Sequence, residues 1–221
     1  KLLLAVYTAA LVLAPLCASA APARGTAASS SELSASDQAF LNARDAVRIG
    51  DRERLAQHAA RLGQHPLAAY IEYWQLLGRI RNAEPKAAAD VAQFMRRHAD
   101  TYIADRLRFD WALVLASQSD YQGFEREAAQ LAWWTDDAQF RCYLALSNYR
   151  RAIAKQADAF ASEARQLLAN TKDSAGEGCI ALTEALLADG RISVWGRVRA
   201  LVEQNQLDAA TRKHVDEIDD P

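Results

Sequence analysis

The chain has 221 residues, of which 51% are hydrophobic and 24% charged, and its 26 basic and 28 acidic residues give a net charge of −2. A chain of this length and apolar content can bury a sizeable core as one domain. The balance of charge argues against a nucleic-acid-binding groove, which needs a strong basic excess, so we expect no nucleic-acid partner.

The first residues have the pattern of a secretory signal peptide. A single positive charge precedes an apolar run over 2–16, and small residues then fit a signal-peptidase site after Ala20. The run is shorter than the roughly 20 residues of a transmembrane helix, so we expect no transmembrane segment in the mature chain. We predict a signal peptide over 1–20 and a periplasmic location. Cys17 offers a lipidation site, but Leu16 is larger than the residue which that processing requires before the cysteine.

Both ends of the chain predict a longer protein. It begins without Met, so we expect the true start a few residues upstream. At the other end, the turn signal Asp219-Asp220-Pro221 directly follows a predicted helix, which is typical of a chain that continues into another element.

The Ser- and Ala-rich tract over 21–36 has few large apolar residues, so we expect a flexible lead there. A first helix is predicted near 37–49. From there a helical-repeat domain is expected over 37–221, truncated at its carboxyl end.

Helix-breaking residues recur about every 35 residues along this domain, with apolar helix faces between them. One set of breaks is predicted at 50–51, 84–85, 119–120, 155–158 and 189–190, and an offset set at 63–66, 99–101, 135–137, 170–173 and 205–206. Two breaks per period predict two helices per repeat. Because one antiparallel pair cannot bury its apolar stripe alone, successive pairs must stack. We therefore predict an all-α fold, an α-solenoid or superhelix of antiparallel helix pairs.

Apolar residues at helical spacing are clearest in three segments. The three sets are Tyr70, Tyr73, Trp74 and Leu77; Ile103, Leu107, Trp111 and Leu115; and Phe140, Tyr143, Leu144 and Leu146. In the second segment Asp105, Arg106, Arg108 and Asp110 are expected to face outward. Pro66 and Pro85 are expected in the first turns of helices, where the missing donor costs nothing.

Cys142 and Cys179 lie one repeat period apart, near equivalent places on neighbouring hairpins. An exported protein permits disulfides, so we predict a bridge between them. Closing a loop of about 37 residues is worth roughly 3–4 kcal/mol in the chain-entropy model. The alternative is two buried free thiols that pack as small apolar residues.

The segments AFLNARDA (39–46), HPLAAYIEYWQL (65–76) and ADRLRFDW (104–111), with the cysteine regions at 141–143 and 178–179, resemble the amino-terminal region of the soluble lytic murein transglycosylases. The resemblance covers most of the mature chain. It rests on scattered helix-face residues in a fixed order and includes no catalytic signature.

This resemblance implies a periplasmic enzyme in which a helical superhelix closes into a ring and carries a lysozyme-like catalytic domain at its carboxyl end. The family cleaves the MurNAc–GlcNAc bond of peptidoglycan without water. A glutamic acid protonates the leaving oxygen, and the C6 hydroxyl of the sugar closes a 1,6-anhydro ring, unlike the usual two-carboxylate arrangement. The acid belongs to a Glu-Ser motif, and no Glu of this chain is followed by Ser. No catalytic residue is therefore expected in this chain, which resembles the first third of such a protein.

Trp133 and Trp134 are the best candidates for glycan contact, because an aromatic face can stack on a sugar ring. They point in different directions on a helix, so at most one is expected to be fully buried. Trp74, Trp111 and Trp195 are expected to fill space between stacked helix pairs.

Other polar groups indicate no chemistry. Six glutamates show no second carboxylate placed for acid–base work: Glu84, Glu125, Glu127, Glu163, Glu177 and Glu184. Four histidines lack the spacing of a zinc site: His58, His65, His98 and His214. A basic run and an acidic tail are interpreted as solvated faces: Arg79, Arg81, Arg96, Arg97 and His98; and Asp216, Glu217, Asp219 and Asp220. No cofactor and no metal are expected.

Two functions remain open on this basis. The first is the superhelical scaffold of a periplasmic lytic transglycosylase, whose partners are peptidoglycan glycan strands and the missing carboxyl-terminal catalytic domain. The second is a stand-alone periplasmic scaffold of tetratricopeptide type that binds protein partners in a concave groove. The segment WQLLG (74–78) matches that repeat pattern only loosely.

Overall fold

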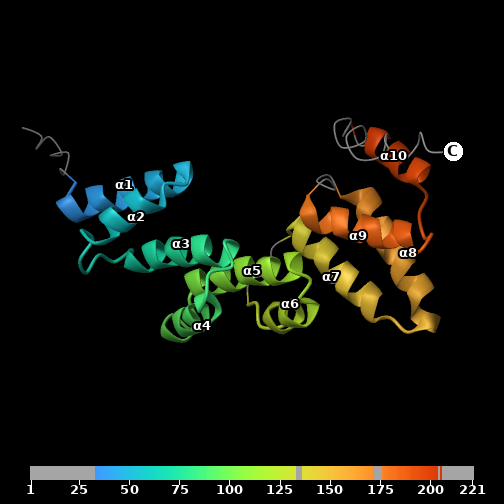
Figure 1. Ribbon diagram of the computed structural model, residues 1–221, viewed down its shortest axis with the longest axis horizontal. Coiled ribbons are helices and arrows are strands. Elements are labelled where there is room, and N and C mark those ends of the chain that lie inside the picture. Colours follow the sequence, from blue (N-terminus) through green and yellow to red (C-terminus); the bar gives the residue numbers. More distant parts are fainter. Residues whose placement is uncertain (1–32, 133–135, 172–175, 204, 206–221) are drawn as a thin grey trace, which may run out of the picture. The chain divides into compact units, whose positions relative to one another are not determined.

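The computed structural model describes residues 33–132, 136–171, 176–203 and 205, and these residues form ten α-helices and no strand (Figure 1). The all-α prediction is confirmed for them. The helices are α1 (Ala35–Ile49), α2 (Arg52–Ala59), α3 (Ala68–Arg81), α4 (Ala87–Arg97), α5 (Tyr102–Ser117), α6 (Tyr121–Ala128), α7 (Ala138–Arg151), α8 (Ala154–Asn170), α9 (Glu177–Ala188) and α10 (Val194–Glu203). All ten belong to one compact unit that begins at Ser34.

Most helix starts carry a side-chain cap. Asp51, Thr101, Asp120 and Asp137 each accept a backbone N–H from the first turn of the helix that follows. At α1, Ser34 accepts from the backbone N–H of Asp37 at 3.1 Å, and the Asp37 carboxylate accepts from the backbone N–H of Ser34. This capping box starts α1 two residues earlier than predicted.

Two local predictions about helix boundaries are wrong. The break predicted over 155–158 lies inside α8, because the chain turns at Ala152 and Ile153, which adopt extended backbone conformations. The predicted stretch contains no Gly or Pro, and its Ala, Lys and Gln residues are good helix formers. Pro66 and Pro85 each lie in a turn two residues before a helix rather than in its first turn.

Helices pack on their neighbours in sequence and on their next-but-one neighbours. Alternate helices meet directly, as α1 with α3, α3 with α5, α5 with α7, and α7 with α9 (Figure 1). The buried side chains form three clusters, which extend over α1 to α3, α3 to α5, and α5 to α9. Packing is therefore local along the chain, as expected of stacked helix pairs.

The apolar faces follow the prediction in α5 and differ in α3. Ile103, Leu107 and Leu115 are buried in α5. In α3 the buried face instead carries Ile71, Tyr73, Leu76 and Ile80, because this helix packs against α1, α2, α4 and α5. Contacts on several sides bury positions that a single helical stripe does not include.

The predicted disulfide is confirmed: Cys142 of α7 and Cys179 of α9 are bonded, with Cα atoms 4.8 Å apart, and both side chains are fully buried. Beside it, Oε1 of Gln139 accepts the backbone N–H groups of Gly178 at 2.9 Å and Cys179 at 3.3 Å. The residue before α9, Gly176, has no side chain that could cap the helix, so Gln139 of α7 supplies the cap.

Gly178 permits a close approach between the same two helices. A Cβ atom at Gly178 would lie 2.6 Å from the backbone oxygen of Gln139 and 2.8 Å from Cδ2 of Tyr143. The glycine, the disulfide and the Gln139 cap therefore together hold the start of α9 against the start of α7.

Within the described ranges, no helix is both long and apolar enough to span a membrane.

Candidate ligand-binding groove

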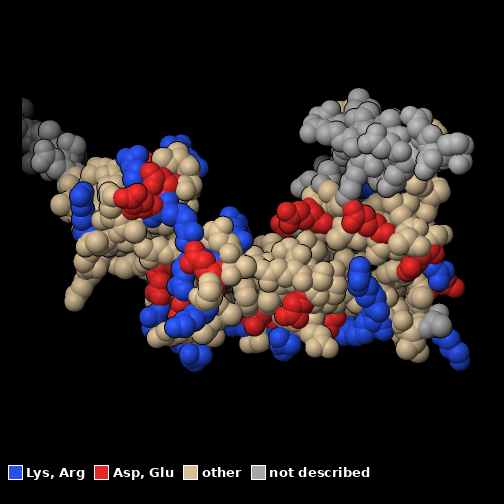
Figure 2. Space-filling view, viewed as in Figure 1, with Lys and Arg blue, Asp and Glu red and all other residues tan. Residues whose placement is uncertain are grey.

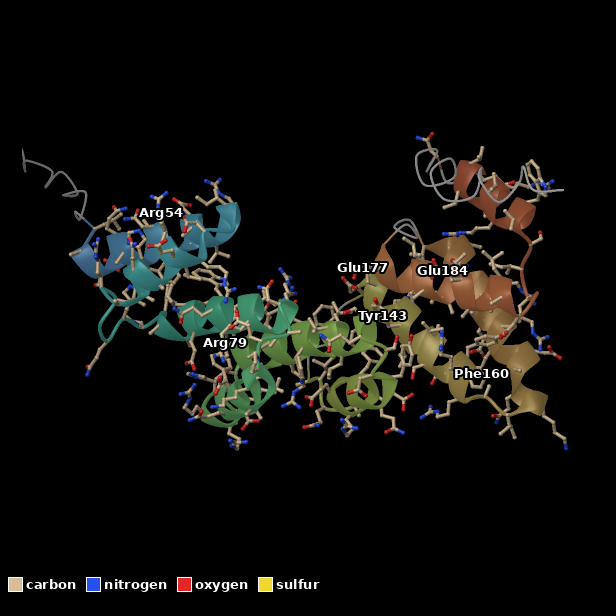
Figure 3. All side chains as sticks on the ribbon, viewed as in Figure 1. Arg54, Arg79, Tyr143, Phe160, Glu177 and Glu184 are labelled. Carbon is tan, nitrogen blue, oxygen red and sulfur yellow. A yellow bond between two sulfur atoms is a disulfide. The ribbon has the colours of Figure 1, made fainter. Side chains whose placement is uncertain are left out.

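A groove of about 480 Å³ is formed where four helices meet, at the carboxyl ends of α3 and α5 and the amino-terminal halves of α7 and α9. It is lined by Arg81, Asp110, Leu113, Val114, Ser117, Gln118, Gln139, Tyr143 and Glu177. Figure 3 labels two of these residues, Tyr143 on α7 and Glu177 at the start of α9. The groove forms because α5 packs against α3, α7 and α9, and α7 packs against α9.

Asp110 is buried at one side of this groove, which makes the prediction that it faces outward wrong. Tyr73 of α3 donates its hydroxyl to Oδ2 of Asp110 at 2.6 Å. Arg106 donates to the same carboxylate from Nε at 3.2 Å and from Nη2 at 3.3 Å. The packing of α3 on α5 thus brings the phenol to the carboxylate, and the guanidinium comes from the preceding turn of α5 itself. Burial, followed by the hydrogen bond to Asp110, raises the pKa of Tyr73 to about 12.

Tyr143 has a buried ring, and its hydroxyl forms no hydrogen bond within the part of the chain that the structure describes. The residue is 4% exposed, and its ring packs against Phe124 at 6.3 Å between centroids. Burial, and then the nearby negative charge of Glu177, raise the pKa of Tyr143, so the phenol keeps its proton. In contrast, Tyr149 donates to Asp189 at 2.7 Å. Since Tyr143 lines the groove, its hydroxyl is a donor available to a ligand.

The groove carries opposite charges on its two sides. Arg81 is the last residue of α3, and Glu177 is the first residue of α9. Both are exposed, and neither forms an ion pair among the described residues. Figure 2 shows acidic side chains along α9. Figure 3 labels two acidic residues of this helix, Glu177 and Glu184. A ligand in the groove therefore meets a cation from α3 and an anion from α9.

Two other arginines of the predicted basic run form local ion pairs. Arg79 donates to Asp90 at 2.7 Å and to Glu84 at 3.3 Å, and Arg97 pairs with Glu72. These guanidinium groups are already matched by carboxylates, so they form no anion site. Arg81 alone of that run lines the groove.

The glutamates and histidines considered from the sequence occupy unrelated places. Glu125 pairs with Arg151, and Glu127 pairs with Arg108. His65 accepts the backbone N–H of Leu67 at Nδ1, so its Nε2 carries the proton and donates to Oδ1 of Asp37, with Nε2 and Oδ1 3.0 Å apart. Within the residues the structure covers, no three potential metal ligands come together.

The tryptophans differ from one another. Trp133 and Trp134, the predicted glycan contacts, lie outside the described residues. Trp74 and Trp111 pack against the buried clusters, as predicted. Trp195 is 65% exposed, so its interpretation as a space-filling residue is wrong; its helix, α10, buries only Arg197 and Leu201.

The groove itself was not predicted from the sequence. Arg81 belonged to a basic run, Tyr143 to an apolar face, and Glu177 to the glutamates considered as acids. Each residue carried a weak local signal, and only the contacts among α3, α5, α7 and α9 bring the three to one surface.

No family model, curated protein or solved structure matches this chain. The groove is therefore interpreted through its chemistry. Its lining has hydrogen-bonding groups and one charge of each sign, but no two unpaired carboxylates that would serve as acid and base. This arrangement suits binding.

Proposed function

We propose that this chain is a helical scaffold that binds an extended ligand, and that it is the amino-terminal superhelical segment of a periplasmic lytic transglycosylase. In this role it positions peptidoglycan strands for a catalytic domain further along the protein. The enzyme cleaves MurNAc–GlcNAc bonds to give 1,6-anhydro ends, and this segment supplies no catalytic group. The observation that carries the proposal is the groove over α3, α5, α7 and α9.

The helix boundaries support a superhelix of stacked pairs. The first helices of the pairs begin at Ala35, Ala68, Tyr102, Ala138 and Glu177, close to the expected period. Contacts between successive first helices are the contacts that give a solenoid one continuous inner surface. The groove is lined by α3, α5, α7 and α9, which supports an extended ligand that contacts several helices.

The Cys142–Cys179 bond supports a location outside the cytosol, because disulfides persist in oxidising compartments. The groove lining supports a polar polymer as ligand. Gln118 and Ser117 offer donors and acceptors at the carboxyl end of α5, while Leu113 and Val114 offer apolar surface to ring faces. This combination is typical of sites for polar ligands that are partly apolar.

A second candidate is a stand-alone scaffold of tetratricopeptide type that binds a protein partner. The observation in its favour is the pair of unmatched charges, Arg81 and Glu177, since a peptide carries both signs whereas a neutral glycan carries neither. The two candidates predict different binding partners for the isolated chain: sacculi for the first and a protein for the second.

Retention on purified sacculi tests the leading proposal. We expect the chain to bind sacculi and Ser117→Trp to abolish binding, because the indole fills the groove from an exposed position. Gln122→Trp, exposed on α6 and away from the groove lining, is the matched control and should bind normally. If the wild-type chain is not retained, the proposal is wrong. Specific capture of one periplasmic protein, lost in Ser117→Trp, would favour the second candidate.

A further inference from the structure

The hydroxyl of Tyr143 indicates one group that the ligand of the groove must carry. A phenol whose ring is held by packing while its hydroxyl reaches a groove offers a fixed donor to a bound acceptor. Tyr73 and Tyr149, the other two buried tyrosines among the described residues, each donate to a carboxylate. Tyr143 reaches no acceptor within the described ranges, and it lines the groove. A ligand there needs a hydrogen-bond acceptor along its length, such as a peptide carbonyl.

The charges flanking Tyr143 indicate the ends of that ligand. Arg81 on α3 offers a guanidinium whose fork matches a carboxylate in bidentate geometry. Glu177 on α9 offers a carboxylate that matches an ammonium group. Asp110 adds no net charge, because Arg106 pairs with it. The complementary ligand is therefore zwitterionic, with its negative group toward α3 and its positive group toward α9.

The size of the groove restricts the ligand further. Its volume of about 480 Å³ lies within the range of about 300–1,000 Å³ that is typical of small-ligand sites. An extended peptide advances about 3.3–3.6 Å per residue, so a few residues place an amine and a carboxylate on opposite sides of a hydrogen-bonding backbone. Leu113 and Val114 provide apolar contact for small side chains.

We infer that this groove binds a short oligopeptide with one free carboxylate and one free amine, held by Arg81, the Tyr143 hydroxyl and Glu177. The inference rests on the proposed function in taking the groove as the ligand-binding surface. It assigns to that groove the peptide part of a peptidoglycan ligand instead of the sugar chain.

Four forms of one peptide test this inference by calorimetry on the full chain: oligoalanine with free ends, with an acetylated amine, with an amidated carboxylate, and with both modifications. Peptides of two to five residues cover the lengths expected for the ligand. At the best length we expect each modification to weaken binding about two- to fivefold, as for exposed ion pairs. Amidation should have no further effect in Arg81→Gln, and acetylation none in Glu177→Gln. Arg61→Gln and Glu203→Gln, both exposed and outside the groove lining, should bind as the wild type does.

Tyr143→Phe tests the hydrogen bond separately. The ring and its packing stay, so we expect an unchanged unfolding midpoint and binding weakened about three- to tenfold for all four peptides. Equal binding of free and doubly modified peptides, or no binding by any of them, overturns the inference. Binding of a neutral N-acetylglucosamine tetrasaccharide that depends on Tyr143 also overturns it, because it places the sugar chain in the groove.

The sacculus assay separates this inference from the proposed function. If the peptides fail to bind while retention on sacculi still depends on Ser117, the inference is wrong and the scaffold function stands. If the peptides bind as expected and the chain is not retained on sacculi, the scaffold function is wrong and the groove is a peptide site of another kind.

Discussion

The hydroxyl of Tyr73 donates a hydrogen bond of 2.6 Å to Asp110, a buried carboxylate 37 residues further along the chain. Arg106 donates to the same carboxylate at 3.2 Å from the preceding turn of α5. The three groups satisfy one another where α3 packs on α5, at the edge of the groove. Such a network is worth more than its separate members, because each unmatched group would be costly in a buried place.

Removing the phenol oxygen should weaken this contact. We expect Tyr73→Phe to lower the free energy of unfolding by about 1 kcal/mol and Asp110→Ala by about 1–3 kcal/mol. Because the two residues share one hydrogen bond, the double variant should lose less than the sum. Urea unfolding measures all three. Tyr70→Phe, on a partly buried ring of the same helix, is the control; an equal effect of the two Tyr→Phe changes would contradict the network.

The same hydrogen bond predicts loss of stability at alkaline pH. Since the pKa of Tyr73 is raised to about 12 from the usual value of about 10 for a tyrosine, the unfolded chain releases this proton first as pH rises. Between these values the unfolded state binds fewer protons, so the free energy of unfolding falls with pH. Below pH 10 the contribution of the Tyr73 phenol to the free energy of unfolding is fully present. The raised pKa values of Tyr143 and Tyr149 act in the same direction.

Urea midpoints measured from pH 9 to pH 12 check this expectation. The fall should be shallower in Tyr73→Phe, and tyrosinate absorbance should show a late-titrating phenol that this variant lacks. A pH dependence identical in wild type and Tyr73→Phe would assign the loss to other groups.

Breaking the disulfide should destabilise the second half of the described chain. The loop between Cys142 and Cys179 spans 37 residues. In the chain-entropy model its closure is worth about 3–4 kcal/mol, so we expect Cys142→Ala/Cys179→Ala to lose about that amount. Urea unfolding with and without reductant measures it. Reductant should lower the stability of the wild type and leave the double variant unchanged; an equal response of both would exclude this bond as the cause.

Two glycines in helices should respond to alanine with opposite sign. At Gly178 the added Cβ would lie 2.6 Å from a backbone oxygen of α7, so we expect Gly178→Ala to cost about 1–3 kcal/mol by overpacking. At Gly78 in α3 the nearest atom is Nε of Arg52 at 3.7 Å. There alanine brings only its better helix propensity, so Gly78→Ala should stabilise by about 0.5–1 kcal/mol. Thermal unfolding distinguishes the pair, and a stabilising Gly178→Ala would show that α7 and α9 are not in close contact.

The sequence predicted the features that depend on nearby residues. Capping side chains, glycines and apolar spacing act over one or two turns, so the helices and most of their boundaries were predicted correctly. The break predicted over 155–158, which lies inside α8, contains no Gly or Pro. The Cys142–Cys179 bond was also predicted, because the two cysteines are one expected repeat period apart in the sequence.

Tertiary structure decided what the sequence left open. Asp110 has the spacing of an exposed residue, and only the contact of α3 with α5 buries it under Tyr73. Arg81, Tyr143 and Glu177 come from three helices and form one groove because those helices pack side by side. Helix formation is set by interactions a few residues apart, so the sequence by itself determined where the helices are. Burial and hydrogen-bond partners depend on helices brought together from distant parts of the chain, so only the folded structure decided which polar groups are matched and which face a ligand.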